Sequence, residues 1–315
     1  MKVGITGGTG LVGSAFAKHE DKKYEWIIIP GPNNGGPDFR DRKETFEYFG
    51  DNNFDALVHT AAKVGGIKAN IDNPLRFYSE NIQINTNVLD AASNVGIKKC
   101  ASFLSTCIYP DRSEYPLTED NIHLGPPHES NMFYAHAKRM LDIHSQAIKK
   151  EKKLNYFCVV PNNLYGINDN FDPNNSHVIP SIILKASEAI QKNKKTLSLW
   201  GNGIPKREFT FSEDIPDVIS FLLKKRKIDN IVNIGNTNRE YSINEVANDI
   251  IALLESSLKI TWDTRKPSGQ LRKPSSQEKL KNLGYDTSKL TDLRLGLKKT
   301  IRWFKENYPN VRGLG

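Results

Sequence analysis

Tyr134 and Lys138 are four residues apart, which is the spacing of two side chains on one face of a helix, about 6 Å apart along its axis. A free tyrosine has a pKa of about 10, and a nearby ammonium stabilises its phenolate. Lowering that pKa by about 2–3 units takes about 3–4 kcal/mol, which one close, desolvated cation can supply. We therefore expect Lys138 to lower the pKa of Tyr134, although such a pair also occurs by chance on exposed helix faces.

Ser105 strengthens this interpretation, because it ends a predicted strand at 99–104. Parallel sheets bind ligands at the carboxyl ends of their strands. A serine at such an edge can meet the tyrosine and the lysine and donate a hydrogen bond to a substrate oxygen. We therefore predict Ser105, Tyr134 and Lys138 as a catalytic group.

A glycine-rich turn with the spacing Gly7-x-x-Gly10-x-x-Gly13 follows a predicted strand at 2–6 and opens a predicted helix at 11–19. Small residues permit a tight turn, a close approach of backbone to pyrophosphate, and close packing of helix on strand. The helix N-terminus adds N–H groups for the anion. Dinucleotide binding is favoured over a purely structural turn, with these residues as the cofactor contacts: Gly7, Thr9, Gly10, Leu11, Val12 and Gly13.

The end of the second predicted strand, at 24–30, carries no carboxylate. Sites that prefer NAD usually have Asp or Glu there to hold the ribose 2′-hydroxyl. Here Ile29 leads into Pro-Gly-Pro-Asn-Asn, so nothing repels a 2′-phosphate. We predict NADP(H), with Asn33, Asn34 or Arg40 near that phosphate; alternatively, the loop is only a surface connection.

Strands and helices alternate through the first half of the chain, which predicts a doubly wound parallel sheet of the Rossmann type, an α/β fold. We predict strands at 2–6, 24–30 (a buried one), 55–59, 99–104 and 155–160, with helices at 11–19, 73–95 and 131–150. Beyond Pro161 we predict helices at 178–192, 214–224 and 243–254, strands at 197–199 and 231–234, and a loop at 264–278. The predicted domains are 1–165, which binds the cofactor, and 166–315, a smaller substrate-binding lobe with some elements returning to the main sheet.

Composition narrows the class of protein. The chain has 315 residues with 44 basic and 36 acidic side chains, a net charge of +8 that favours anionic small molecules. Nucleic-acid binding rests on that charge alone and is the weakest alternative. No apolar run is long enough to span a bilayer, the N-terminus does not read as a secretory leader, and three cysteines without metal-ligand spacing suggest a reducing, cytoplasmic setting without a metal.

The glycine turn, Ser105 and the Tyr134-x-x-x-Lys138 pair resemble the extended short-chain dehydrogenase/reductase family. Further strings narrow the resemblance to its GDP-L-fucose synthases, and they are spread over nearly the whole chain. They stand at 59–66, 104–110 (Leu-Ser-Thr-Cys-Ile-Tyr-Pro), 161–166, 169–171, 176–180 (Ser-His-Val-Ile-Pro), 200–203 and 207–209.

The resemblance implies an NADPH-dependent epimerase/reductase acting on a GDP-linked 4-keto-6-deoxy sugar. It gives Cys107 and His177 the roles of base and acid at C3 and C5, and Tyr134 the protonation of the C4 alkoxide. Read alone, Cys107 is a small buried hydrophobe and His177 a structural loop histidine. Further cofactor contacts are expected at Asp41, Ala61, Ala62, Lys138, Asn163 and His177. Substrate contacts are expected at Lys63, Ser105, Lys185, Trp200, Arg207 and Lys266, although core packing of Trp200 and solvation of Lys266 are the alternatives.

The resemblance also implies a homodimer formed through the helices near 73–95 and 131–150 as a four-helix bundle. Other functions stay open. The chain can be a C4 reductase of a GDP-4-keto-6-deoxyheptose with little or no epimerisation, a 4-epimerase that retains NAD, or a cofactor-binding protein without turnover. No membrane partner is expected.

Overall fold

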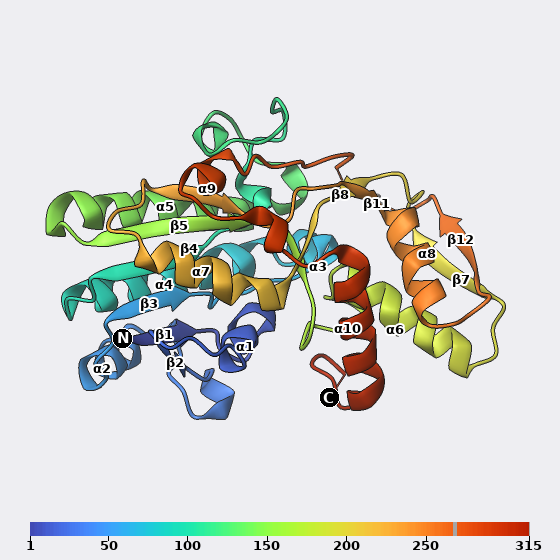
Figure 1. Ribbon diagram of the computed structural model, residues 1–315, viewed down its shortest axis with the longest axis horizontal. Coiled ribbons are helices and arrows are strands. Elements are labelled where there is room, and N and C mark those ends of the chain that lie inside the picture. Colours follow the sequence, from blue (N-terminus) through green and yellow to red (C-terminus); the bar gives the residue numbers. More distant parts are fainter. Residues whose placement is uncertain (267–269, 315) are drawn as a thin grey trace.

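A six-stranded sheet forms the centre of the main lobe in the computed structural model, which describes residues 1–266 and 270–314 (Figure 1). The strand order is β10-β5-β4-β3-β1-β2, and every pairing is parallel. The strands are β1 (Lys2–Thr6), β2 (Glu25–Ile28), β3 (Ala56–His59), β4 (Lys99–Phe103), β5 (Asn155–Pro161) and β10 (Ile231–Ile234). The chain first adds β2 on one side of β1 and then adds β3, β4 and β5 on the other side, so the strand order changes direction between β1 and β3. This arrangement confirms the predicted Rossmann-type α/β class.

Successive side chains of each strand point to opposite faces of the sheet, so the core of the main lobe has two layers, one on each face. Leu57 and Tyr156 pack under one set of helices, and their neighbours Val58 and Phe157 pack under the other. The first layer is covered by α2 (Arg42–Asp51), α4 (Pro74–Asn94) and α5 (Met132–Lys152). The second is covered by α1 (Leu11–Ala17), α7 (Ile215–Lys224) and α9 (Glu278–Asn282). Both faces are thus sealed, which leaves the strand ends as the place for chemistry.

A smaller lobe lies beside the carboxyl ends of the sheet (Figure 1) and has its own apolar core. Its helices are α6 (Val178–Gln191), α8 (Ile243–Leu253) and α10 (Leu293–Asn307). They pack with β7 (Thr196–Trp200) and β12 (Lys259–Asp263), which pair in parallel. Short pairs complete the structure: β6 (Asn163–Tyr165) with β9 (Phe209–Phe211), and β8 (Lys206–Arg207) with β11 (Tyr241–Ser242). The helix α3 (Ile67–Asp72) precedes α4.

The structure departs from the predicted elements in a few places. The predicted buried strand at 24–30 is wrong in its burial: β2 is an edge strand, Ile27 and Ile28 are half-buried, and the buried residues Tyr24 and Ile29 flank the strand on either side. The prediction omitted α2, α10 and β12. Of the predicted loop at 264–278, residues 267–269 lie outside the described residues, and α9 begins at its last residue.

β10 joins the main sheet beside β5, although it lies within the range assigned to the second lobe, so part of that range returns to the main sheet as expected. The boundary between 165 and 166 stays a prediction. Within the part of the chain that the structure describes, none of the helices combines the length and the apolar character that a membrane crossing requires.

Candidate active site

The glycine turn is packed so tightly that side chains cannot enter it. Gly7 has a φ of +70°, and a Cβ there would lie 2.7 Å from the backbone nitrogen of Ala61. A Cβ on Gly13 would lie 2.4 Å from the carbonyl oxygen of Gly7. A Cβ on Gly10 would meet only the Gly7 oxygen at 3.3 Å and Arg312 Nη1 at 3.9 Å. The turn therefore combines a closed backbone at Gly7 and Gly13 with room in front of Gly10, and it fits a ligand that approaches the backbone closely.

The ends of β1 and β3 are tied together beside this turn. Thr60 Oγ1 donates to the carbonyl of Thr6 at 2.6 Å, and the backbone N–H of Ala61 donates to Thr6 Oγ1 at 3.2 Å. Ala61 and Ala62 are partly buried here. The two alanines thus stand next to the turn, where the prediction placed cofactor contacts.

The loop after β2 contains no free carboxylate near its start. Asp38 binds Arg40 through both carboxylate oxygens, and Arg40 also lies 3.5 Å from Glu80. Asp41 is the N-cap of α2 and accepts a hydrogen bond from the N–H of Glu44 at 2.9 Å. The carboxylate of Asp41 therefore has a structural partner, and its role at the cofactor stays a prediction.

Four of the predicted catalytic side chains gather where β4 ends. Ser105 caps a short 3₁₀ turn at 106–108 and accepts from the N–H of Cys107 at 3.5 Å. Lys138 is 2% exposed, and its Nζ donates to the carbonyl of Phe103, the last residue of β4, at 3.0 Å. Charge at Cys107 shifts the pKa of both Lys138 and Tyr134, which places the thiol within electrostatic range of both. The structure thus brings Ser105, Cys107, Tyr134 and Lys138 together.

The expected effect of Lys138 on Tyr134 is wrong for this structure. Burial, followed by charge at Cys107, raises the pKa of Tyr134 above its usual value. Burial also lowers the pKa of Lys138 to about 8. A shared helix face brings two residues near each other but does not make them partners, and here the ammonium is bound to the Phe103 carbonyl instead.

A buried chain of polar groups fixes the backbone around this centre. His59 at the end of β3 contacts Thr6 Oγ1 through Nδ1 at 2.8 Å and Asn85 Oδ1 through Nε2 at 3.2 Å. Asn85 in turn donates to the carbonyl of Ala137, the neighbour of Lys138, at 3.2 Å. Burial, followed by the charge of Lys138, lowers the pKa of His59 to about 3, so its ring is neutral and links β1, β3, α4 and α5 without charge.

His177 is the N-cap residue of α6 and is exposed. Even so, the protein atoms around the imidazole disfavour its charged form and lower its pKa, and the positive charge of Arg312 acts in the same direction. His177 is therefore a neutral, accessible imidazole at physiological pH.

Three of the predicted substrate residues form a cluster in the smaller lobe. The indole of Trp200 is 49% exposed and does not lie in the core. Lys185 Nζ lies 5.6 Å from the centre of this ring, and Lys266 Nζ lies 5.4 Å from it. An exposed aromatic face with two ammonium groups suits a stacked base or sugar next to phosphates.

The other predicted contacts have mixed surroundings. Arg207 is half-buried and donates to the carbonyls of Lys206 and Gln270, each at 2.7 Å. The side chain of Asn163 donates to the carbonyl of Glu208 at 2.9 Å, so it holds the β6–β9 segment together. The backbone of Lys63 is clamped by Asn81, which accepts from its N–H and donates to its carbonyl.

Sequence reasoning missed two cationic residues. Lys273 supplies the first of the charges that oppose the effect of burial on the Cys107 thiol, ahead of Lys138. Arg312, near the end of the chain, reaches the glycine turn. Both stand in loops without periodic apolar residues, so no local signal marks them.

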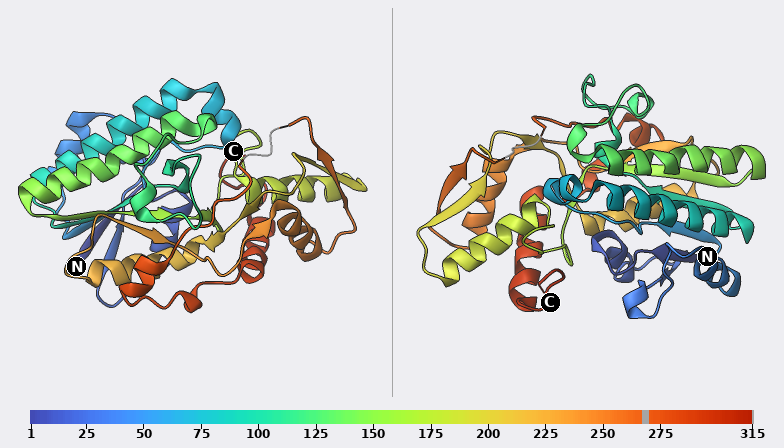
Figure 2. Two further views of the ribbon diagram at one scale, coloured as in Figure 1. Left: turned by 90° about the horizontal axis from the view of Figure 1, so that it is seen from above. Right: turned by 180° about the vertical axis from the view of Figure 1, so that it is seen from behind.

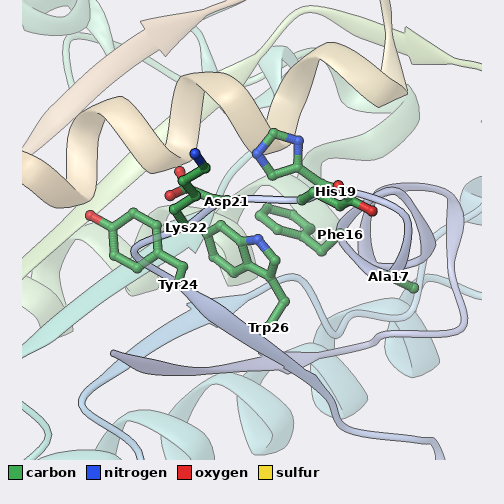
Figure 3. Close-up of a pocket in the computed structure, with 8 residues that line it drawn as sticks. Phe16, Ala17, His19, Asp21, Lys22, Tyr24 and Trp26 are labelled. Atoms are coloured by element: carbon green, nitrogen blue, oxygen red, sulfur yellow. The ribbon is translucent and has the colours of Figure 1, made fainter.

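One pocket of about 460 Å³ lies apart from these residues, between α1 and β2, and is lined in part by Phe16, His19, Tyr24 and Trp26 (Figure 3). None of the predicted catalytic or binding side chains contributes to it. The candidate active site is therefore defined by the convergence of side chains at the strand ends.

Known proteins match this chain over most of its length. The model of the NAD dependent epimerase/dehydratase family matches residues 3–235. A GDP-L-fucose synthase of Dictyostelium discoideum is 37% identical over 314 residues, covering 98% of this chain and 96% of that protein. A GDP-L-fucose synthetase structure from Naegleria fowleri bound to NADP is 32% identical, with a TM-score of 0.89 over 99% of this chain and 96% of that one.

A GDP-6-OMe-4-keto-L-xylo-heptose reductase structure from C. jejuni has a TM-score of 0.87 over 97% of this chain and 98% of that one. Its 24% identity shows a shared fold only. The family match and the identities over nearly full length confirm the resemblance read from the motifs. The chain therefore belongs to the NAD dependent epimerase/dehydratase family, and within that family it is related to the GDP-L-fucose synthases.

Proposed function

We propose that this protein reduces the C4 ketone of a GDP-4-keto-6-deoxy sugar with NADPH and epimerises the sugar at C3 and C5. The observation that carries the proposal is the gathering of Ser105, Cys107, Tyr134 and Lys138 at the end of β4. The GDP-L-fucose synthase of Dictyostelium and the NADP-bound synthetase of Naegleria support the substrate class and the cofactor.

The glycine turn fits NADP(H), because its backbone is accessible at Gly10 and closed at Gly7 and Gly13. The turn, Ala61, Ala62 and Lys138 would hold the cofactor, which supplies the hydride when bound. The loop after β2 supports NADP(H) over NAD(H), since Asp38 is neutralised by Arg40 and leaves no free carboxylate for a ribose 2′-hydroxyl.

Reduction needs a proton for the oxygen at C4. Burial keeps Tyr134 protonated at neutral pH, so the phenol can donate a hydrogen bond to the ketone and then release its proton to the alkoxide. Ser105 donates a second hydrogen bond and stabilises the same oxygen. Lys138, with a pKa of about 8, is still mostly charged at neutral pH and is assigned to the cofactor rather than to the phenol.

Epimerisation needs one group that accepts a proton and one that donates it from the opposite side. The ketone makes the protons on C3 and C5 acidic, and the donors at Ser105 and Tyr134 stabilise the enolate. His177 rests as a neutral imidazole, a proton acceptor, because its pKa is lowered. Cys107 rests as a thiol, a proton donor, because burial raises its pKa, while Lys273 and Lys138 stabilise the thiolate once it forms. These resting states reverse the roles expected from the resemblance, in which Cys107 was the base and His177 the acid.

The guanosine diphosphate of the substrate would lie on the smaller lobe. Trp200 offers an exposed aromatic face, and Lys185 and Lys266 bring two cations to it. Arg207 adds a half-buried guanidinium. Because water screens a half-buried charge less, its attraction to a phosphate is stronger than that of an exposed arginine. Lys63 and Asn163 stay assigned to the walls of the site.

The protein would act as a cytoplasmic homodimer through α4 and α5. These two helices run side by side on one face of the main lobe (Figure 2) and contact each other closely. Their exposed apolar side chains are Leu75, Tyr78, Phe133, Met140 and Ile143. Burying such side chains against a second copy removes apolar surface from water.

Incubation with NADPH and GDP-4-keto-6-deoxymannose in deuterated water tests the function. We expect loss of NADPH absorbance and a product with deuterium bound to carbon, because each proton removed from C3 or C5 is replaced from solvent. A Tyr134→Phe variant should lose the NADPH oxidation while the folded state, measured by circular dichroism, persists.

The remaining candidate functions give different results. Turnover without deuterium on carbon would remove the epimerase roles of Cys107 and His177. Consumption of a GDP-4-keto-6-deoxyheptose in preference to the hexose would favour the heptose reductase. Tightly held NAD without net NADPH oxidation would favour a 4-epimerase, and no turnover of either sugar would leave a cofactor-binding protein.

A further inference from the structure

The last described residues of the chain are held against the loop at 168–172. The N–H of Phe171 donates to the carbonyl of Arg312 at 2.8 Å. Gly313 has a φ of +95°, and a Cβ there would lie 2.2 Å from Asn170 Oδ1 and 2.5 Å from the nitrogen of Asp172. The backbone on both sides of Arg312 is therefore fixed by this loop, and its side chain leaves from a defined position.

The same loop is joined to the glycine turn. Asn168 Nδ2 donates to the carbonyl of Thr9 at 3.0 Å, and Arg312 Nη1 donates to the carbonyl of Asn168 at 3.3 Å. Arg312 Nη1 also lies 3.9 Å from the position that a Cβ of Gly10 would take. The guanidinium thus stands in front of Gly10, on the side where that residue has open space.

The charge of Arg312 has no close counter-ion in the described residues. No carboxylate of that part of the chain lies within 4.0 Å of it. Asp169 is near enough for the two charges to interact, but it is 2% exposed, its Oδ2 has no hydrogen-bond partner, and burial raises its pKa to about 7. A half-buried, incompletely neutralised guanidinium at a phosphate-binding turn is a site for an anion.

We propose that Arg312 binds the pyrophosphate of NADP(H), so that the C-terminal segment completes the cofactor site and the carbonyl of Asn168 positions the guanidinium. The assignment is to the pyrophosphate because Arg312 stands at Gly10, whereas Asn33, Asn34 and Arg40 lie on the loop after β2 that would face the 2′-phosphate. The inference rests on the glycine turn as the cofactor site, and binding to the unaltered protein tests that premise separately.

Dissociation constants for NADPH and for NADH, measured by nicotinamide fluorescence with the full-length protein and no sugar present, test the proposal. Arg312→Met should weaken both by the same factor, about 10 to 100-fold, since a charge-assisted hydrogen bond to the shared pyrophosphate is lost. Arg312→Lys should recover part of the affinity through its charge. Arg302→Met is the matched control, because Arg302 lies on α10, is highly exposed and pairs only with Glu306 among the described residues.

Each other outcome overturns the assignment. Unchanged constants in Arg312→Met, with a lowered unfolding temperature of the cofactor-free protein, would make Arg312 a structural link between the tail and the loop. A loss confined to NADPH would place the guanidinium at the 2′-phosphate. Unchanged binding with a shifted pH profile of deuterium exchange would mean that Arg312 acts on His177 alone.

Discussion

Lys138 illustrates how a catalytic residue can work against the stability of its own fold. Its ammonium is almost fully buried and has one hydrogen-bond partner in the described part of the chain, the carbonyl of Phe103. Desolvation disfavours the charged form, which is why the pKa falls to about 8. The folded protein therefore binds fewer protons at this position than the unfolded chain does between about pH 8 and pH 10.5, and stability rises with pH across that range.

Lys138→Met should consequently abolish reduction and stabilise the fold. At about pH 7 we expect the free energy of unfolding to rise by about 1–3 kcal/mol, after the lost bond to Phe103 is taken into account. The gain should shrink by about 2 kcal/mol toward pH 9.5, because the buried lysine of the folded protein loses its proton above about pH 8 while the unfolded lysine still keeps it. Urea unfolding at the two pH values measures both effects. Lys150→Met, an exposed change on the same helix, should alter neither, and a gain for Lys138→Met that is constant with pH would contradict the argument.

Cys107 should separate the two reactions of the site. Cys107→Ser keeps the shape of the 3₁₀ turn but replaces the thiol by a hydroxyl, which is a far weaker acid. We expect deuterium incorporation at carbon to fall by about 100-fold, the scale of a lost general acid, while hydride transfer to the ketone falls much less. Mass spectrometry of the product reports the first and NADPH absorbance the second.

Cys158→Ser is the control for this change, because Cys158 is a buried free cysteine that contacts Ser145 in the core of the main lobe. It should alter stability and leave the ratio of the two reactions unchanged. Equal losses of exchange and of hydride transfer in Cys107→Ser would argue for a purely structural role of the thiol.

At the scale of elements, the glycine turn offers a test with a matched pair. Gly13→Ala would press its Cβ to 2.4 Å from the Gly7 oxygen and 2.5 Å from the Gly8 Cα, and neither backbone atom can move away cheaply. We expect a loss of about 1–3 kcal/mol in unfolding free energy and no measurable NADPH binding. Gly50→Ala, near the end of α2, where a Cβ would have nothing within 4 Å, should weaken neither the fold nor NADPH binding. Wild-type NADPH affinity in Gly13→Ala would show that the turn is not the pyrophosphate site.

The elements differ in how far their residues reveal them. The turn between β1 and α1, the Tyr134 to Lys138 spacing and the strands of the main sheet are local patterns, and the sequence predicted them. The signal for α10 is also local, with apolar residues at Leu293, Leu297, Ile301 and Phe304, and our prediction left it out. By contrast, β12 has only half-buried apolar residues and owes its strand state to pairing with β7.

Contacts between distant segments escaped prediction for the same physical reason. Whether Lys138 bonds Tyr134 or the Phe103 carbonyl depends on how α5 lies against β4, which no spacing along the chain specifies. Lys273 and Arg312 reach the site from irregular segments, and only the folded arrangement brings them to Cys107 and Gly10.

At the scale of the whole molecule, the helix α5 carries a catalytic residue on one side and exposed apolar side chains on the other. The inner face of α5 carries buried Lys138, while Phe133, Met140 and Ile143 point outward and are each 45–46% exposed. Dimerisation over α4 and α5 would therefore brace the helix that holds the active site. Stability of the fold and assembly of the dimer should then be linked through protein concentration.

Introducing charge on that surface tests the assembly. The double variant Met140→Glu and Ile143→Glu places two carboxylates in the proposed interface, where burial without partners disfavours association. We expect light scattering at micromolar concentration to show a dimer for the unaltered protein and a monomer for the variant, with a lower thermal midpoint because association no longer stabilises the fold. Leu295→Glu, at a 52% exposed position on α10, should stay dimeric. A monomeric unaltered protein, or a dimer that survives both glutamates, would move the interface away from α5.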